Sequence, residues 1–400
     1  MQTTAMAGGL DSKQARAAKK SEAGSPPRAR AHGMSRRSAP SVAANRTHDD
    51  WPDQPPRTAT PPGPVRDGWP DEPPRAATSP PAVARPSAPA ATEPAAANLD
   101  TLKGLFRRPA DVPSSAARDE IALGARLFAE VKLSADHKMS CATCHDPAQA
   151  LTDGRVRARG NQGQTLARNT PALWNAAWQK HLYWDGRSAT LEAQAKDAIE
   201  RDGEMDGTLQ AAALWLSREA SYSGVFERVY RASALADPAL ITRALAAYER
   251  SLVSPPTRFD RWIDGDAAAL NVNEVAGFRL FAGKARCLAC HGGWRFTDDD
   301  FHDIGLRSPD RGRSALADAK TAGRAFKTPS LREAVWTAHY MHDGSLATFE
   351  AVLDHYTLRL DRRSSIAPEL RTPIVLTAAE RGDLIAFLRT LSSPSLPRVP

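Results

Sequence analysis

Cysteine is scarce in this chain, which has four cysteines among its 400 residues. So few thiols argue against a structural disulfide framework, which requires a much higher density. Long hydrophobic runs are absent too: no stretch is long enough to span a membrane, and none near Met1 has the apolar core of a secretion signal. The net charge is +7, but the basic residues are dispersed among acids without a Lys/Arg stripe, so we expect no nucleic-acid partner.

The four cysteines fall into two copies of one motif. The copies are Cys141-Ala142-Thr143-Cys144-His145 and Cys287-Leu288-Ala289-Cys290-His291. This CxxCH pattern is typical of covalent c-type haem attachment. Two thiols on one helical turn add to the vinyl groups of a haem, and the histidine behind them lies under the iron as its proximal ligand. The doubled motif therefore predicts two covalently bound haem c groups, with His145 and His291 as iron ligands.

Two other cysteine chemistries fit the spacing less well. A four-cysteine zinc site gives no reason for a histidine at the same offset after both pairs. Redox disulfides of the thioredoxin type usually occur singly, in a βαβ context that is absent from this sequence. We therefore favour haem attachment, which takes place outside the cytoplasm. The expected location is the periplasm, although the sequence has no clear signal peptide.

Residues 1–100 are predicted to be a disordered segment rich in proline and alanine. They hold 17 of the 31 prolines and almost no large aliphatic side chains, so they cannot bury enough apolar surface to offset the entropy lost on ordering. A seven-residue sequence at Trp51–Arg57, WPDQPPR, recurs as WPDEPPR at Trp69–Arg75. Such a repeat is typical of a stiff, extended linker, and a docking motif is the alternative.

The remainder of the chain is predicted to be mainly α. Several segments have apolar residues at helical spacing, and none shows sustained alternation of apolar and polar residues. In the first of them, Ile121, Gly124 and Phe128 are expected on one face. The last begins with a capping box formed by Thr377 and Glu380. The predicted helices lie within residues 115–130, 207–220 and 238–253 and after residue 377.

An internal repeat relates the regions that follow the two cysteine motifs. Each residue of the first copy corresponds to the residue 158 positions later. For example, Thr170-Pro171-Ala172-Leu173 corresponds to Thr328-Pro329-Ser330-Leu331. Duplication of one helical haem domain explains this most economically. We therefore predict two cytochrome c-like domains, at residues 101–265 and 266–393, called here the first and second halves.

The two halves differ at positions that bear on iron coordination. Trp184 of the first half stands opposite His342 of the second, and Tyr356 of the second stands opposite Ala198, which cannot bind iron. An iron with an open face can bind a small oxidant, whereas six-coordinate iron suits electron transfer. This difference favours an enzyme over a simple electron carrier.

Further motifs resemble the bacterial dihaem cytochrome c peroxidase and MauG family. Besides the CxxCH sites they are Arg168-Asn169-Thr170-Pro171, Tyr183-Trp184-Asp185-Gly186-Arg187 and the pair Phe326–Arg332 and Tyr340–Gly344. The resemblance covers about residues 103–393. It implies hydrogen peroxide as the substrate and a small cytochrome or a cupredoxin as the electron donor, and it is compatible with a homodimer.

The resemblance implies roles for three residues near the first haem. Trp184 corresponds to the tryptophan that lies between the haems in the family, and Gln194 and Glu204 correspond to its distal glutamine and glutamate. The glutamate acts in acid–base catalysis, because a proton must pass from one oxygen of peroxide to the other before the bond breaks. A carboxylate in a mostly apolar haem pocket can have a pKa suited to this task.

The first haem departs from the peroxidase pattern. Those peroxidases have a distal histidine in this region, but the sequence between His145 and His181 contains no histidine. In the loop where those peroxidases have this histidine, the present sequence has Asn161 or its neighbours. The first haem is therefore predicted to be five-coordinate or water-bound.

The second haem is predicted to have a tyrosine ligand. The family's sixth ligand is methionine in the peroxidases and tyrosine in MauG, and it follows the histidine of the motif around His342 by fourteen residues, which gives Tyr356. A phenolate ligand stabilises ferric iron and lowers its potential relative to methionine. Met341 and His355 are the competing ligands.

The family also binds a calcium ion between its domains. By resemblance, the ligands here are the Asn169 side chain and the backbone carbonyls of Thr337 and His339. Oxygen donors of this kind suit a hard cation.

Three functions are consistent with the sequence. The leading hypothesis is a dihaem peroxidase that reduces hydrogen peroxide to water with electrons passed from a donor through the second haem. The second is a MauG-like oxidase that acts on a protein or a small organic substrate, and Tyr356 favours it. The third is a non-enzymatic dihaem electron carrier or redox sensor, which requires two six-coordinate haems.

Overall fold

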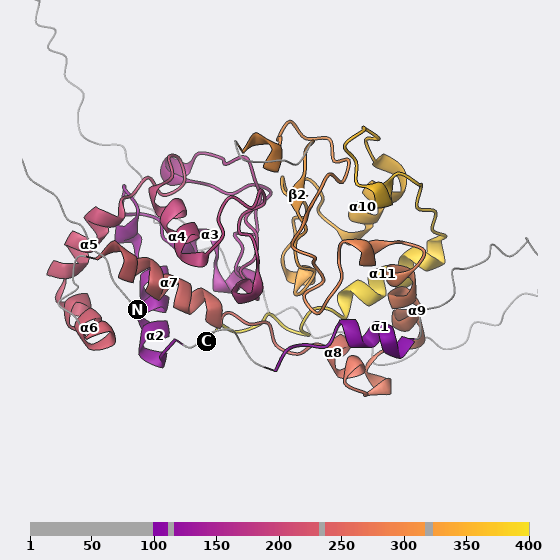
Figure 1. Ribbon diagram of the computed structural model, residues 1–400, viewed down its shortest axis with the longest axis horizontal. Helices are drawn as coiled ribbons and strands as arrows, with labels where there is room; N and C mark the ends of the chain where they lie inside the picture. The colour runs from indigo at the N-terminus through magenta and orange to yellow at the C-terminus, as the bar shows by residue number, and fades with distance from the viewer. Residues whose placement is uncertain (1–98, 111–115, 232–236, 317–322, 400) are drawn as a thin grey trace, which may run out of the picture. The chain divides into compact units, whose positions relative to one another are not determined.

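Figure 1 shows a computed structural model of the chain. The structure describes residues 99–110, 116–231, 237–316 and 323–399. The proline-rich segment and its seven-residue repeat lie outside these residues. Within them the chain is mainly helical, as predicted, and the only strands are two short ones that pair with each other. None of the described helices is long and apolar enough to cross a membrane.

The regular elements follow one another along the chain, and some of the connections between them are long. The helices are α1 (Leu99–Leu105), α2 (Arg118–Phe128), α3 (Cys141–Cys144), α4 (Leu191–Glu200), α5 (Leu209–Arg218), α6 (Ala220–Tyr230), α7 (Pro238–Ser251), α8 (Arg258–Ile263), α9 (Val272–Ala282), α10 (Phe349–Asp354) and α11 (Ala378–Arg389). The strands are β1 (Phe301–His302) and β2 (Phe326–Lys327), which pair antiparallel. Long connections lie between α3 and α4 and between α9 and α10. Short 3₁₀ turns fill many of the connections, and the π-helical turn His355–Arg359 continues α10.

The predicted helices are present as α2, α5, α7 and α11. The predicted capping box opens α11: the Thr377 hydroxyl accepts a hydrogen bond from the Glu380 amide, and the Glu380 carboxylate accepts one from the Thr377 amide. In α2 the buried face is shifted from the predicted one. Leu123 and Leu127 lie in the core beside Phe128, whereas Ile121 is only partly buried. The shift arises because α2 lies against both α6 and α7, so its apolar stripe is wider than the spacing suggested.

Each half is built around a close pair of helices with glycine at the crossing. In the first half α2 crosses α7, and a Cβ placed on Gly124 would lie 2.0 Å from the Ala244 carbonyl oxygen. In the second half α9 crosses α11, and a Cβ on Gly277 would lie 2.0 Å from the Asp383 carbonyl oxygen. Only glycine allows backbones to approach this closely. The two glycines belong to the matching Gly-x-x-Leu-Phe-Ala segments that precede the two haem motifs.

The core of the second half draws on the segment before α2. Phe106, which follows α1, is fully buried and packs its ring against Phe278 and Phe296. Phe259 of α8 joins the same cluster. Figure 1 accordingly shows α1, in indigo, beside α8 and α9. The sequence had assigned residues 101–265 to the first half, whereas the structure places α1 and α8 in the core of the second.

The two halves meet through a reciprocal pair of backbone hydrogen bonds. The Lys327 amide donates to the Trp184 carbonyl, and the Asn169 amide donates to the His342 carbonyl, both at 2.8 Å. Lys327 and Asn169 are separated by 158 residues, as are His342 and Trp184. The contact between the halves therefore follows the repeat found in the sequence, while a common ancestor for the two halves stays a prediction.

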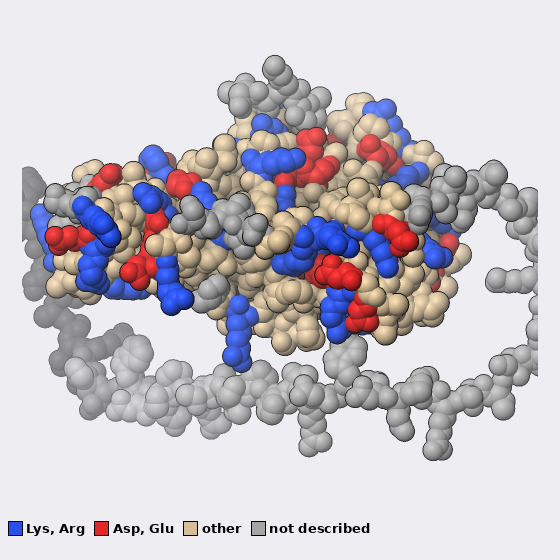
Figure 2. Space-filling model, turned by 60° about the horizontal axis from the view of Figure 1, so that its bottom comes forward, with Lys and Arg blue, Asp and Glu red and all other residues tan. Residues whose placement is uncertain are grey.

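Charged side chains are mixed on the molecular surface. On the face drawn in Figure 2, Lys and Arg side chains lie among Asp and Glu side chains and among uncharged residues. This view agrees with the dispersed charge predicted from the sequence.

Substitution of Gly124 by alanine should destabilise the fold, because the new methyl group overlaps the Ala244 carbonyl and the Tyr248 side chain. We expect the free energy of unfolding to fall by about 1–3 kcal/mol. Gly382→Ala in α11 is the matched control, since a Cβ there meets nothing within 4 Å. This control should be neutral or gain up to about 1 kcal/mol from helix propensity. Urea denaturation of the haem-loaded proteins measures both, and equal stabilities would contradict the account of the crossing.

Candidate active site

One large cavity brings together residues of both halves. Its volume is about 1000 Å³, and every predicted site residue except Cys141 lines it. Cys141 instead packs against the hydrophobic core of the first half. From the first half the predicted residues are Cys144, His145, Asn169, Trp184, Gln194 and Glu204. From the second half they are Cys287, Cys290, His291, Thr337, His339 and Tyr356.

Local structure presents each CxxCH motif to this cavity. Cys141 and Cys144 lie on the single turn α3, which a capping box between Ser140 and Thr143 initiates. The His145 Nδ1 lies 3.0 Å from the Leu151 carbonyl oxygen, and the His291 Nδ1 lies 2.8 Å from its counterpart on Phe296. A carbonyl accepts only from a protonated Nδ1, so the Nε2 of each neutral ring carries the lone pair. This is the usual outer arrangement around a histidine that binds a metal.

The state of the thiols fits haem better than zinc or disulfides. All four cysteines are free. Burial raises the pKa of the Cys144 thiol to about 11 and that of Cys287 to about 12, so both are neutral at physiological pH. Among the described residues, the one group with metal-ligand spacing is Cys290 with Asp298 and His302, and no four-cysteine cluster forms. His145, His291 and three of the four cysteines line the large cavity, an arrangement that suits thioether attachment of haem c.

Trp184 is held from both halves. Its indole Nε1 donates to the Asn169 carbonyl at 2.9 Å, and its own carbonyl accepts from the Lys327 amide. The preceding Tyr183 adopts a left-handed backbone conformation, with φ of 66°, and so does Gly186 at 70°. A Cβ on Gly186 would overlap the Phe301 ring of the second half. The tight turn around Trp184 therefore lies directly against the other half of the molecule.

Glu204 lies in a turn that follows α4. Burial raises the pKa of its carboxyl to about 7, against the opposing influence of the Arg187 and Arg201 guanidinium groups. Its backbone is fixed because the Asn161 amide donates to the Glu204 carbonyl at 2.7 Å. Gln194, on α4, lines the same cavity. At neutral pH such a carboxyl exchanges protons readily in either direction.

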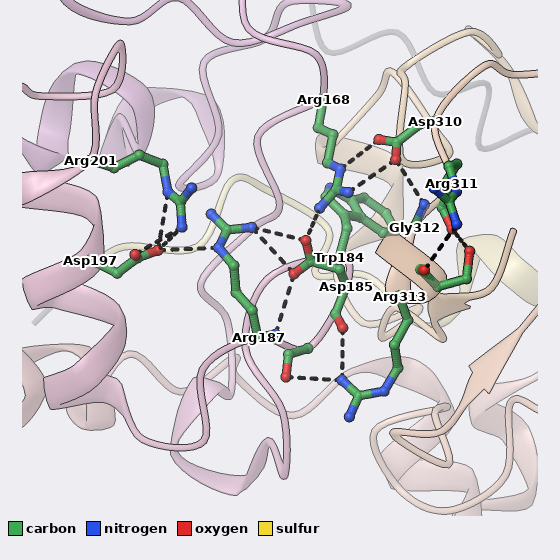
Figure 3. Close-up of polar contacts among 12 residues, drawn as sticks. Arg168, Trp184, Asp185, Arg187, Asp197, Arg201, Asp310, Arg311, Gly312 and Arg313 are labelled. Atoms are coloured by element: carbon green, nitrogen blue, oxygen red, sulfur yellow. Dashed lines mark hydrogen bonds and ion pairs between the residues drawn. The ribbon is translucent and has the colours of Figure 1, made fainter. Parts of the chain in front are cut away.

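Alternating arginines and aspartates run beside the Trp184 turn, as Figure 3 shows. Arg168 bonds to Asp185 at 2.6 Å and to Asp310 of the second half at 2.7 Å. Arg187 then joins Asp185 to Asp197. The last two links in the chain, Asp197 to Arg201 at 2.7 Å and Arg201 to Glu204 at 3.6 Å, end at the buried carboxyl.

Tyr356 has an apolar environment in the second half. It lies on the π-helical turn after α10 and packs against a cluster that includes Ile366 and Ile374. Burial raises the pKa of its phenol, and the nearby thiols of the second motif act in the same direction. Its competitor His355 is engaged elsewhere, since its Nε2 lies 2.9 Å from the Ile304 carbonyl oxygen.

The other ligand candidates and the loop residue have distinct surroundings. Met341 lines the cavity with a left-handed backbone conformation, φ being 71°. The Asn161 side chain does not line the cavity but donates to Asp206 at 2.9 Å.

Of the described histidines of the first half, only His145 lines the cavity. The Nδ2 of Asn169 donates to the Arg155 carbonyl at 2.8 Å and to the Val156 carbonyl at 3.3 Å.

Glu249 and Lys327 are two of the charged cavity residues that were not predicted. Glu249 of α7 is buried, and burial raises its pKa to about 8. Its Oε2 has no hydrogen-bond partner among the described residues. Lys327 is also buried, and burial lowers the pKa of its ammonium to about 8. Lys327 stands within a family motif and could have been singled out, whereas Glu249 follows an Ala/Leu-rich run and gave no signal.

Comparison with known proteins agrees with this geometry. A family model described as di-haem cytochrome c peroxidase matches residues 118–268. The chain is 40% identical to the methylamine utilization protein MauG of Methylorubrum extorquens, over 78% of this chain and 92% of that protein. It is 34% identical to the cytochrome-c peroxidase IdrP1 of Denitromonas iodatirespirans, over 71% and 84% of the two chains.

A solved structure extends the comparison to the fold. The crystal structure of a MauG-like protein associated with microbial copper homeostasis superposes with a TM-score of 0.64 at 29% identity, covering 77% of this chain and 97% of that one. The relatives thus match the described residues over most of their length. This chain belongs to the dihaem cytochrome c peroxidase and MauG family, whose members carry haem c.

Proposed function

We propose that this protein is a dihaem peroxidase that reduces hydrogen peroxide to two molecules of water, consuming two electrons and two protons. The observation that carries the proposal is the contrast between the two ends of the cavity. The end at His145 has Glu204, with a pKa of about 7, and no second histidine of its own half. The end at His291 has Tyr356 in a closed apolar environment.

Glu204 is the acid–base group in this proposal. As a carboxylate it accepts the proton from one oxygen of peroxide, and as an acid it returns that proton to the oxygen that leaves as water. Gln194 has an amide that can orient the peroxide by hydrogen bonding. When bound, the haem attached at Cys141 and Cys144 supplies the electrons for cleavage of the O–O bond.

Trp184 and Tyr356 serve the electron supply. Trp184 is in contact with both halves through its hydrogen bonds to Asn169 and Lys327, so it offers an aromatic link between the two haem sites. Tyr356 would be the side chain that holds the second haem iron, and six-coordinate iron would suit electron transfer rather than peroxide binding. A ferric iron beside it would favour the phenolate form against the effect of burial.

The remaining assignments follow from family membership. The donor is a small cytochrome or a cupredoxin, and the protein acts in the periplasm, where haem c is attached. Calcium, which the family resemblance implies, would be held by the Asn169 Oδ1 and the carbonyls of Thr337 and His339. All three residues line the cavity, and oxygen ligands of this kind suit Ca²⁺.

A second candidate function is MauG-like oxidation of a protein or a small organic substrate. Tyr356 favours it, as does the 40% identity to a methylamine utilization protein MauG. In this case the two oxidising equivalents from peroxide are consumed by oxidation of the substrate, and not by electrons from a donor cytochrome.

Glu204→Gln should lower the rate constant for peroxide reduction by about 10²- to 10⁴-fold, the usual contribution of a general acid–base group. In the unaltered protein this rate constant should rise with pH through about 7, because Glu204 must be ionised to accept the proton. The variant should lose this rise. Stopped-flow absorbance over pH 5–9 measures both effects. Glu227→Gln on the exposed face of α6 is the matched control, and equal rates in the two variants would contradict the role of Glu204.

Tyr356→Met should raise the reduction potential of the second haem, by a fraction of the roughly 0.8 V range that axial ligands control. Spectroelectrochemical titration measures this shift. Tyr356→Phe is the control, because it removes the oxygen ligand without supplying sulfur and should leave the second haem high-spin. An unchanged potential in Tyr356→Met would rule out tyrosine ligation. Retained oxidation of a donor cytochrome by this variant favours the peroxidase, whereas loss of organic substrate oxidation favours the MauG-like function.

A further inference from the structure

A second hollow lies beside the haem cavity. It opens to the surface at the end of α4 and has a volume of about 530 Å³. Most of its lining residues are polar or charged, namely Ser188, Lys196, Asp197, Glu200, Arg201 and Asp202, and Ala193 completes the lining. Arg201 and Asp202 line this hollow and the haem cavity alike. They therefore lie in the wall between this hollow and the cavity, on the side where Arg201 contacts the Glu204 carboxylate.

The Arg201 side chain is held in this wall by ion pairs alone. Its guanidinium contacts both carboxylate oxygens of Asp197, at 2.7 and 2.8 Å, and its Nε lies 3.6 Å from the Glu204 carboxylate. Asp197 is held on its other side by Arg187, as Figure 3 shows. Arg201 is therefore attached to the wall on one side and directed toward the acid–base residue on the other.

The neighbouring backbone is fixed more firmly than this side chain. The Gln164 side chain donates to the Gly203 carbonyl at 2.8 Å, and the Asn161 amide donates to the Glu204 carbonyl. In contrast, 40% of the Arg201 side-chain surface and 32% of that of Asp197 are exposed to solvent. Because this pair is partly exposed, it costs less to open than the more buried pair between Arg168 and Asp185 in the same chain of charges. The Arg201 side chain is the part of the wall that can move.

We propose that this hollow is the entrance through which small polar molecules reach the His145 end of the cavity, with Arg201 as its gate and Asp197 as the residue that holds the gate closed. The entrant is hydrogen peroxide, and this identity depends on the proposed function. Peroxide is small, uncharged and able to hydrogen-bond at every step along a charged lining. The entrance leads directly to Glu204 and Gln194, where its proton transfer takes place.

The binding of cyanide to the ferric protein tests the gate without any turnover. In Arg201→Ala the association rate constant of cyanide should increase roughly two- to fivefold, because the ion pair no longer has to open. Stopped-flow absorbance of the first haem measures this rate. Asp197→Asn should act in the same direction. The dissociation constant should stay unchanged, because a gate accelerates entry and exit equally. For imidazole, a larger probe, the association rate constant should increase by a larger factor than for cyanide.

Lys196→Ala is the matched control, because Lys196 lines the hollow but not the cavity. Its cyanide association rate should equal that of the unaltered protein. An unchanged rate in Arg201→Ala would overturn the gate and leave the peroxidase proposal standing. Equal increases in the association rate constants of cyanide and imidazole would also overturn the gate. A gate should affect the larger probe more, whereas an effect of Arg201 on the charge of Glu204 would not depend on size. If cyanide does not bind the unaltered protein, the open iron face and the entrance are both wrong.

Discussion

The reciprocal hydrogen bonds between the two halves are the constraint on which the rest of this structure depends. Lys327 donates to the Trp184 carbonyl, and Asn169 donates to the His342 carbonyl. Each bond contributes only about 0.5–1.5 kcal/mol, but a buried backbone group left unpaired costs more. The pair therefore fixes the register in which the halves meet. With this register set, both CxxCH motifs face one cavity, and Trp184 lies where it contacts both halves.

Within this shared frame, the two ends of the cavity differ in chemistry. The first end has a carboxyl poised near neutrality and a chain of arginines and aspartates that connects it to Asp310 of the second half. The second end has a phenol among aliphatic side chains. The difference lies in a few side chains such as Glu204, in the turn after α4, and Tyr356, on the π-helical turn after α10. A change of coordination and acidity can therefore separate catalysis from electron supply without a change of fold.

Much of this arrangement was predictable from the sequence, because its signals are local. The haem motifs, the capping box at Thr377 and the 158-residue register depend on short spacings. The packing of Phe106 against the second half was missed, since contacts between segments distant in sequence leave no periodic trace. Glu249 was missed because a buried acid in a helix cannot be told from a surface acid by pattern alone. The loop around Asn161 was expected to supply no iron ligand, and the bond from its side chain to Asp206 was not predictable because it joins segments 45 residues apart.

The central claim is that one haem has an open face while the other is closed by Tyr356. The electron paramagnetic resonance spectrum of the resting ferric protein tests it most directly, because spin state reports coordination. The account predicts one high-spin signal from the haem at His145 and one low-spin signal from the haem at His291. Two low-spin signals would contradict it, since both irons would then be six-coordinate and neither could bind peroxide.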